Sequence, residues 1–258
     1  MSGEIKYFYY TDHPLSIEMS KYFSEGFGTI PQHVSKVKEI QEPGFFYGIL
    51  RNCYDGMMFL KSLGKDFYYI DYGYIRKSKI NNELYYRICK NSRFHCFFQE
   101  NIKSDRFEEL GIEINYKENQ GQKIVIFEPS PYVCMINRLN QLQWSEHIKE
   151  QIRKYTKRDI IITRKSSSNI DDPFKDMYVL VHYASMGAIE ALIRNIPIIT
   201  LGDFFLEKIY NNRIENIESL SLCENREKIL YNLAYNQYNL KEIRSGKAKE
   251  ILEKLGVF

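Results

Sequence analysis

The sequence predicts an α/β fold made of two Rossmann-like halves that face a cleft, with helices at the C-terminus. Three observations predict it: residues 178–202 follow a strand-helix-strand pattern, residues 6–71 alternate strand and helix patterns, and a second alternation begins at residue 123. Such alternation is typical of parallel sheets with right-handed crossovers. We place a first domain at residues 1–122 and a second at 123–258, with the polar stretch 119–122 as the linker.

The segment 178–202 is the strongest strand-helix-strand pattern. Its apolar run Tyr178–Val181 has the composition of a buried strand, and the apolar residues 189, 192 and 193 recur at helical spacing. Asn195 is expected to end the helix, and Pro197–Leu201 to form the next strand. Ligands of parallel sheets lie beyond the carboxyl ends of the strands, so we expect residues 182–187 to face a phosphate at the start of the helix.

The remaining elements follow the same rules of periodicity and termination. Residues 75–122 have no clear pattern, and 94–98 is only strand-like. We expect strands at 6–10, 34–40, 66–71, 123–127 and 159–163, and helices at 15–23, 52–63, 144–154, 226–237 and 240–255.

Composition excludes several classes of protein. The chain has 258 residues, 44% of them hydrophobic, and a net charge of +3, which does not by itself indicate a nucleic-acid partner. No apolar run has the length of a membrane span, and no signal peptide is visible, so we expect a cytoplasmic protein without a membrane partner. The five cysteines are scattered without C-x-x-C spacing, which predicts reduced thiols and no zinc site.

Three segments of the second half resemble the GT-B glycosyltransferases. They are Phe127-Glu128-Pro129-Ser130, then Thr163-Arg164-Lys165, and HYASMGAIEALIRNIPII at 182–199. The last is similar to the donor-binding segment of that family, although Asn195 stands where glycine is usual. The resemblance implies an enzyme that transfers sugar from a nucleotide sugar, such as a UDP-sugar, without a metal or other cofactor. The first half would then hold the acceptor.

The resemblance also implies which residues hold the donor. A departing diphosphate needs positive charge and hydrogen-bond donors, which a helix start and an Arg-Lys pair supply. His182 could point at the leaving phosphate or be packed in the core, Ser185 could serve only as a helix cap, and Glu190 could be a surface residue. The expected donor-binding residues are Ser130, Arg164, Lys165, His182, Ser185, Met186, Gly187 and Glu190.

Transfer to a hydroxyl also needs a general base, which we expect from the first half. Asp12 and His13 directly follow the first strand, and Asp71 ends a later one. Asp12 could instead cap the helix that begins at Pro14, and Asp71 could form a turn. Which of the three is the base is left open by the sequence.

The acceptor is suggested by residues 76–93, where Arg76, Lys77 and Arg87 are interleaved with aromatic residues, namely Tyr74, Tyr85, Tyr86 and Phe94. Basic residues bind phosphates and aromatic residues stack on bases, although an ordinary exposed hairpin has the same composition. The stretches 66–75 and 238–252 resemble glycosyltransferases of phage genomes, including those that modify DNA bases. We therefore expect a hydroxymethylated base in double-stranded phage DNA as acceptor. A saccharide acceptor, a non-catalytic nucleotide- or nucleic-acid-binding module and a sugar-nucleotide epimerase are the alternatives, and the oligomeric state is not predicted.

Overall fold

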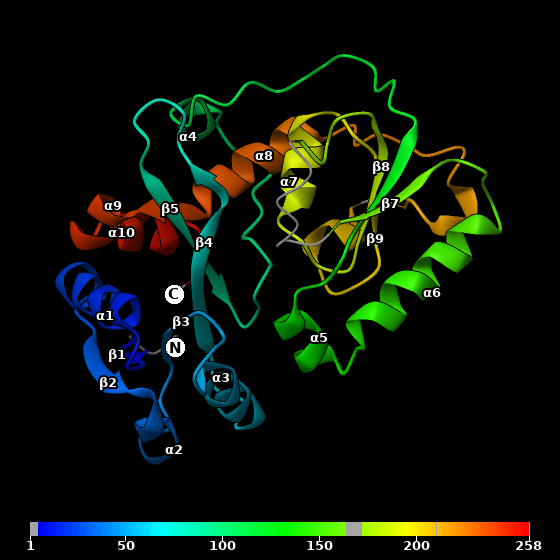
Figure 1. Ribbon diagram of the computed structural model, residues 1–258. Coiled ribbons are helices and arrows are strands. Elements are labelled where there is room, and N and C mark those ends of the chain that lie inside the picture. The colour runs from blue at the N-terminus through cyan, green and yellow to red at the C-terminus, as the bar shows by residue number, and fades with distance from the viewer. Residues whose placement is uncertain (1–4, 164–171, 210, 258) are drawn as a thin grey trace. The chain divides into compact units, whose positions relative to one another are not determined.

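A computed structural model describes residues 5–163, 172–209 and 211–257 (Figure 1). The chain divides into two compact units. The first unit combines residues 1–112 with 228–258, and the second comprises residues 113–227.

The first unit is built on a six-stranded sheet with the order β10-β5-β4-β3-β1-β2. Strands β1 to β4 are parallel, whereas β5 is antiparallel to β4 and β10 is antiparallel to β5. The strands are β1 (Tyr7–Tyr10), β2 (Ile30–His33), β3 (Gly44–Tyr47), β4 (Phe67–Lys77), β5 (Leu84–Lys90) and β10 (Gln237–Asn239).

Helices cover both faces of this sheet. Helix α1 packs against α9 and α10, and their buried apolar side chains share one core with Phe8 and Phe45 of the sheet. Helix α3 lies on the other face, where Gly56 is close to the ring of Phe46. The helical segments are α1 (Pro14–Phe27), η1 (Val34–Lys36), α2 (Val37–Ile40), α3 (Cys53–Ser62), α4 (Asp105–Glu108), α8 (Arg226–Tyr235), α9 (Leu240–Arg244) and α10 (Lys247–Lys254).

The second unit has a four-stranded, wholly parallel sheet with the order β7-β6-β8-β9. Its strands are nearly continuous apolar runs, as expected for a sheet that is covered on both faces. The elements are β6 (Lys123–Phe127), α5 (Pro131–Asn137), α6 (Gln141–Arg153), β7 (Ile160–Thr163), β8 (Met177–His182), α7 (Gly187–Ile193), β9 (Ile198–Thr200), η2 (Phe205–Lys208) and η3 (Ile214–Asn216).

The parallel strands of both units follow the same order along the chain. In each unit the second strand lies outside the first, and the third and fourth follow on its other side, as β2-β1-β3-β4 and β7-β6-β8-β9. The chain therefore changes direction between β1 and β3 in one sheet and between β6 and β8 in the other. Ligands of open parallel sheets bind beyond the carboxyl ends of strands at such switch points.

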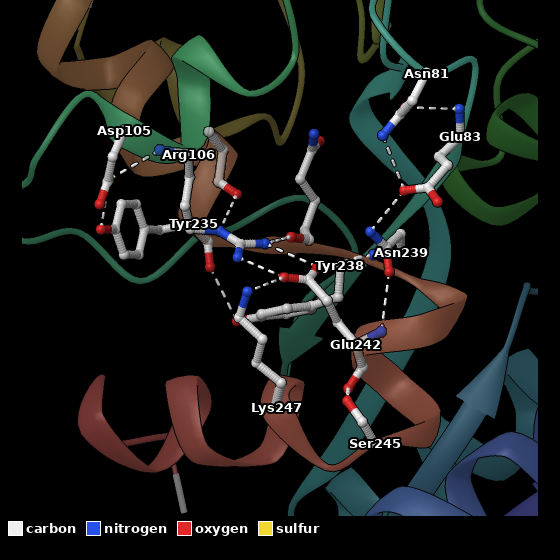
Figure 2. Close-up of polar contacts among 12 residues, drawn as sticks. Asn81, Glu83, Asp105, Arg106, Tyr235, Tyr238, Asn239, Glu242, Ser245 and Lys247 are labelled. Carbon is white, nitrogen blue, oxygen red and sulfur yellow. Dashed lines mark hydrogen bonds and ion pairs between the residues drawn. The ribbon is translucent and has the colours of Figure 1, made fainter.

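The end of the chain completes the first unit (Figure 2). Arg106 is buried and donates hydrogen bonds to both carboxylate oxygens of Glu242, at 2.7 and 3.1 Å. It also donates to the carbonyl oxygens of Ala234 and Gln237. A buried charge that is paired and fully hydrogen-bonded in this way holds α9 and β10 against α4.

Several expectations hold. The predicted strands at 123–127 and 159–163 are β6 and β7, the predicted helix at 52–63 is α3, and the strand-helix-strand segment is β8, α7 and β9. Asn195 follows α7 with φ of 62°, in the left-handed region expected of a residue that ends a helix.

Other expectations are wrong. Residues 34–40 are helical, because Val34 and Val37 are buried at a spacing of three residues, and the strand precedes them as β2. The strand at 66–71 continues to Lys77, and residues 94–98 form no strand. The single helix expected at 240–255 is two helices, separated at Gly246, whose φ is 81°.

The observed grouping of residues differs from the expected division at residue 122. Residues 113–122 group with the second unit, where Asn119 donates a hydrogen bond to the carbonyl oxygen of Tyr178. Residues 228–258, which we assigned to the second half, group with the first, because β10 pairs with β5.

Candidate functional site

The second unit brings two of the predicted donor loops to one edge of its sheet. Phe127 and His182 are paired residues at the ends of β6 and β8, which flank the switch point. The loop with Ser130 follows β6, and the loop with Ser185 follows β8. Ser130 caps α5, because its hydroxyl accepts a hydrogen bond from the N–H of Val133 at 3.3 Å.

His182 is a packed core residue. Its side chain is fully buried, Nδ1 accepts a hydrogen bond from the N–H of Ser185 at 3.0 Å, and Nε2 lies 3.1 Å from the hydroxyl of Thr200. Burial lowers its pKa to about 3, so the ring is neutral at ordinary pH. Of the two interpretations left open by the sequence, the structure favours packing. His182 shapes the loop, and no face of its ring is left for a phosphate.

The start of α7 is half-buried and organised by Ser185. The Ser185 hydroxyl accepts a hydrogen bond from the N–H of Gly187 at 3.2 Å, and its carbonyl accepts one from the N–H of Ala188. Met186, just before the helix, makes no side-chain cap. Gly187 packs directly against the ring of Phe127, where a Cβ would overlap the ring. The Ser185 hydroxyl keeps its own proton, with which it can donate one further hydrogen bond.

Glu190 forms an ion pair within the second unit. The guanidinium of Arg194 donates to Glu190 at 2.6 Å and to Asp172 at 2.7 Å, and it lies 4.9 Å from the centre of the Phe174 ring. Arg164 and Lys165 lie outside the described residues. They directly follow Thr163, the last residue of β7, which pairs with Phe127.

In the first unit, Asp12 lies at the carboxyl edge of β1 beside the switch point. Its side chain is 91% exposed, and the Nε2 atom of His33 is 3.5 Å from its Oδ1. The loop that carries Asp12 is fixed by the buried Thr11. The N–H of Thr11 donates to the Ser16 hydroxyl at 3.0 Å, and the Thr11 hydroxyl accepts from the N–H of His13.

His13, and not Asp12, caps helix α1. Nδ1 of His13 accepts a hydrogen bond from the N–H of Leu15 at 3.3 Å, and Pro14 occupies the first turn. The lone pair of Nδ1 is therefore directed at the start of the helix. His13 is therefore a weaker candidate for a general base than Asp12.

Asp71 is bonded inside the sheet and does not end a strand. One of its oxygens accepts from the hydroxyl of Tyr69 at 2.7 Å and from Arg87 at 3.2 Å, and the other accepts from the N–H of Tyr72. Gly73 forms no turn here: strand β4 continues, and a Cβ at Gly73 would lie 2.7 Å from the side-chain oxygen of Gln237. Asp71 balances the charge of Arg87.

The predicted acceptor cluster is divided by the structure. Arg87 is 3% exposed and donates to the carbonyl oxygens of Tyr72 and Arg93 as well as to Asp71. Arg76 and Lys77 are exposed at the end of β4, where Arg76 stacks on the ring of Tyr72 at 3.9 Å. The aromatic residues expected to stack on a base are buried: Tyr74, Tyr85, Tyr86 and Phe94.

Sequence reasoning missed His33 at this edge. Residue 33 was read as lying outside a strand, so nothing marked it as the end of β2. Cys53 also lies close to this edge, in the first turn of α3, but it is fully buried, and burial raises its pKa to about 12. Cys53 is therefore a protonated packing residue and not a nucleophile.

The described residues contain neither a cluster that could bind a metal nor a helix that could span a membrane. Within them, no group of three or more His, Cys, Asp or Glu side chains has an arrangement that could hold a metal ion. No helix in the same part of the chain is both long and apolar enough to span a membrane.

A hollow of about 560 Å³ in the first unit lies away from the switch point, beside α9 and α10 (Figure 2). Its polar groups largely bond one another: Asn81, Asn239 and Lys241 all donate to Glu83. Lys247 is ion-paired with Glu242. We assign no ligand to this hollow.

Two sheets that each contain four parallel strands in the same order, with polar loops at the switch points, define an α/β protein. No family model matches the sequence, and no curated protein matches it. The fold itself is similar to solved structures of sugar transferases.

One such structure is the beta Kdo 2,7 transferase of Thermosulfurimonas dismutans KpsC, with a TM-score of 0.56 and 10% identity over 95% of this chain and 99% of that one. Another is the beta Kdo 2,4 transferase of the same KpsC, with a TM-score of 0.53 and 6% identity over 92% of each chain. At these identities the likeness shows the fold, and the predicted glycosyltransferase-like α/β class is confirmed to that extent. Neither structure is described as a phage protein or as acting on DNA.

Proposed function

We propose that this protein transfers a glycosyl group from a nucleotide-activated sugar to a hydroxyl group of a saccharide acceptor. The observation that carries the proposal is the likeness to two sugar transferases over more than nine tenths of the chain. The saccharide acceptor is preferred over DNA, because both of those structures are named for the transfer of Kdo and neither name mentions DNA. The expected base-stacking residues of this chain are also buried.

Asp12 is the general base of the proposed reaction. It is the exposed carboxylate directly after β1 at the switch edge, whereas Asp71 is tied to Arg87 and His13 caps a helix. The acceptor hydroxyl gives its proton to Asp12 as its oxygen attacks the anomeric carbon. The bond from that carbon to the phosphate oxygen then breaks, and the nucleotide leaves.

The second unit binds the donor in this proposal. The Ser185 hydroxyl donates to a phosphate oxygen, Ser130 lies in the neighbouring loop, and Arg164 and Lys165, which directly follow Thr163 in the sequence, supply positive charge. Electrostatic stabilisation of the leaving phosphate at such an edge can replace a metal ion. The nucleotide is a uridine diphosphate in our working hypothesis, and other activated sugars belong in the test.

The test is a transfer assay that combines nucleotide sugars with saccharide acceptors, read by mass spectrometry. Wild type should yield a glycosylated product. Asp12→Asn should lower kcat about 100- to 10,000-fold, the usual contribution of a general base. Asp159→Asn is the matched control, because it removes an exposed carboxylate at the other end of a strand, ahead of β7. No product from any pair in the panel, or equal rates for wild type and Asp12→Asn, would refute the proposal.

A further inference from the structure

His33 lies beside Asp12 and is held in place by the first sheet. It ends β2, where it is the register partner of Tyr10 in β1, and its ring meets that of Tyr10 edge to face at 5.6 Å. Its side chain is 35% exposed, against 91% for Asp12. The packed ring of His33 therefore lies beside an exposed carboxylate.

The protonation of the His33 ring follows from its partners. Its Nδ1 accepts a hydrogen bond from the N–H of Ser35 at 3.3 Å and lies 2.8 Å from the Ser35 hydroxyl. A neutral imidazole has one donor and one acceptor nitrogen, so the proton must be on Nε2. Nε2 is the atom that lies 3.5 Å from Oδ1 of Asp12. His33 thus presents a donor to this carboxylate.

We propose that His33 is a positioning residue that orients Asp12 for the transfer reaction, an inference that rests on the proposed function. In the reaction the N–H of Nε2, which lies 3.5 Å from Oδ1 in the structure, closes on Oδ1 and leaves Oδ2 to receive the proton of the acceptor hydroxyl. His33 keeps its own proton throughout, and Asp12 later releases the acquired proton to water. Holding an otherwise free side chain in a reactive orientation raises the rate without new contacts to the substrate.

His33 is also the N-cap of η1, through the bond from the N–H of Ser35 to its Nδ1. Two substitutions separate the positioning role from this capping role. In His33→Gln the longer amide places its N–H₂ near the position of Nε2, so the donor to Asp12 is kept. In His33→Asn the shorter side chain places its oxygen near the position of Nδ1, so the bond from the N–H of Ser35 is kept while Asp12 is out of reach. If His33 acts only as a cap, His33→Asn should keep the wild-type activity. If His33 positions Asp12, His33→Gln should keep it.

The expected result is a split between stability and rate. His33→Asn should unfold at nearly the wild-type temperature, yet lose about 10- to 100-fold in kcat with little change in KM. His33→Gln should unfold at a lower temperature and keep kcat within about threefold of wild type. The opposite order, with Asn active and Gln inactive, would overturn the inference, and so would equal kcat values in both variants.

A second measurement does not depend on turnover. Nitrogen-15 spectra of the histidine rings should show His33 with its proton on Nε2, and Asp12→Asn should shift that resonance. His147, an exposed residue on α6, should be unaffected. The inference is overturned, even if the protein is a transferase, by either of two results. One is a proton on Nδ1 of His33, and the other is a His33 resonance that Asp12→Asn does not shift. If wild type transfers no sugar, the proposed function and the positioning role fail together, and the spectra still show whether the pair exists.

Discussion

Three histidines near the carboxyl ends of strands accept hydrogen bonds from the backbone that follows them. His13, His33 and His182 each accept a main-chain N–H on Nδ1, from Leu15, Ser35 and Ser185. Each ring thereby fixes a loop or a helix start at an edge where a ligand is expected. In each neutral ring the lone pair of Nδ1 is therefore used by the backbone, whereas Asp12 keeps an exposed carboxylate.

His182 makes the stability of the protein depend on pH. Its pKa is about 3 in the folded state because of burial, against about 6.5 in an unfolded chain. Between these two pKa values, residue 182 binds a proton in the unfolded chain but not in the folded protein. The free energy of unfolding therefore falls as pH is lowered through this window, by about 1.4 kcal/mol per pH unit from this residue.

His182→Asn tests this dependence, because its oxygen can still accept from Ser185 but it does not titrate. The variant should be less stable at pH 7, and its urea-unfolding free energy should fall less steeply than that of wild type between pH 6 and 4. Parallel pH profiles for the two proteins would contradict the assignment.

The sequence placed Asp12, Ser130 and Ser185 at strand ends because they directly follow apolar runs. It could not distinguish Asp71 or Arg87 from surface residues. The two side chains meet only because β4 and β5 pair, and they are 16 residues apart in the sequence. His33 was missed for a related reason: β2 includes Pro31 and is partly exposed, so it lacks the apolar signal of a buried strand.

At the scale of elements, helix α1 approaches α9 more closely than a side chain would allow. A Cβ on Gly26 would overlap the carbonyl oxygen of Ile243, an atom of the backbone of α9. Gly26 thus permits contact between helices that are more than 200 residues apart in the chain. The sequence predicted a helix at 15–23, so Gly26 fell outside the predicted helix.

Gly26→Ala should therefore destabilise the protein. In an ordinary helix this change is favourable by about 0.5–1 kcal/mol, whereas forcing two packed helices apart costs about 1–3 kcal/mol or more. Denaturant unfolding should show a net loss of about 1–3 kcal/mol. Lys21→Ala, at an exposed position on the same helix, should be nearly neutral. Stability equal to or above that of wild type in Gly26→Ala would contradict this packing.

Periodicity identified the second sheet well and the first sheet less well. Strands β6, β7 and β8 are short runs rich in β-branched residues, so their pattern is unambiguous. In the first unit, β3 has only four residues. Strand β5 pairs on one side with β4 and on the other with β10, which lies about 150 residues later in the sequence. No local pattern could reveal that pairing.

At the scale of the whole molecule, the first unit is assembled from both ends of the chain. Tyr238, Ile243, Leu252 and Val257 are fully buried in the same core as Phe8. The second unit has a separate core drawn from β6, β8 and α6. The first unit therefore depends on the last residues, while the second contains all of its own core.

This organisation predicts how fragments behave. Residues 113–227 alone should show cooperative thermal unfolding by circular dichroism. Residues 1–112 alone should not, because part of their core and the partner of β5 are missing. Joining 1–112 to 228–258 through a flexible linker should restore cooperative unfolding. Cooperative unfolding of 1–112 by itself would show that the C-terminal segment is dispensable.

The pairing of β10 with β5 also has a consequence during protein synthesis. A ribosome releases residues 113–227 before the strand that completes the first sheet has been made, so the middle of the protein is free to fold before its beginning. Until residues 237–239 have been made, one edge of β5 lacks its partner strand. During that time the newly made first part of the chain exposes a strand edge that can pair with another chain.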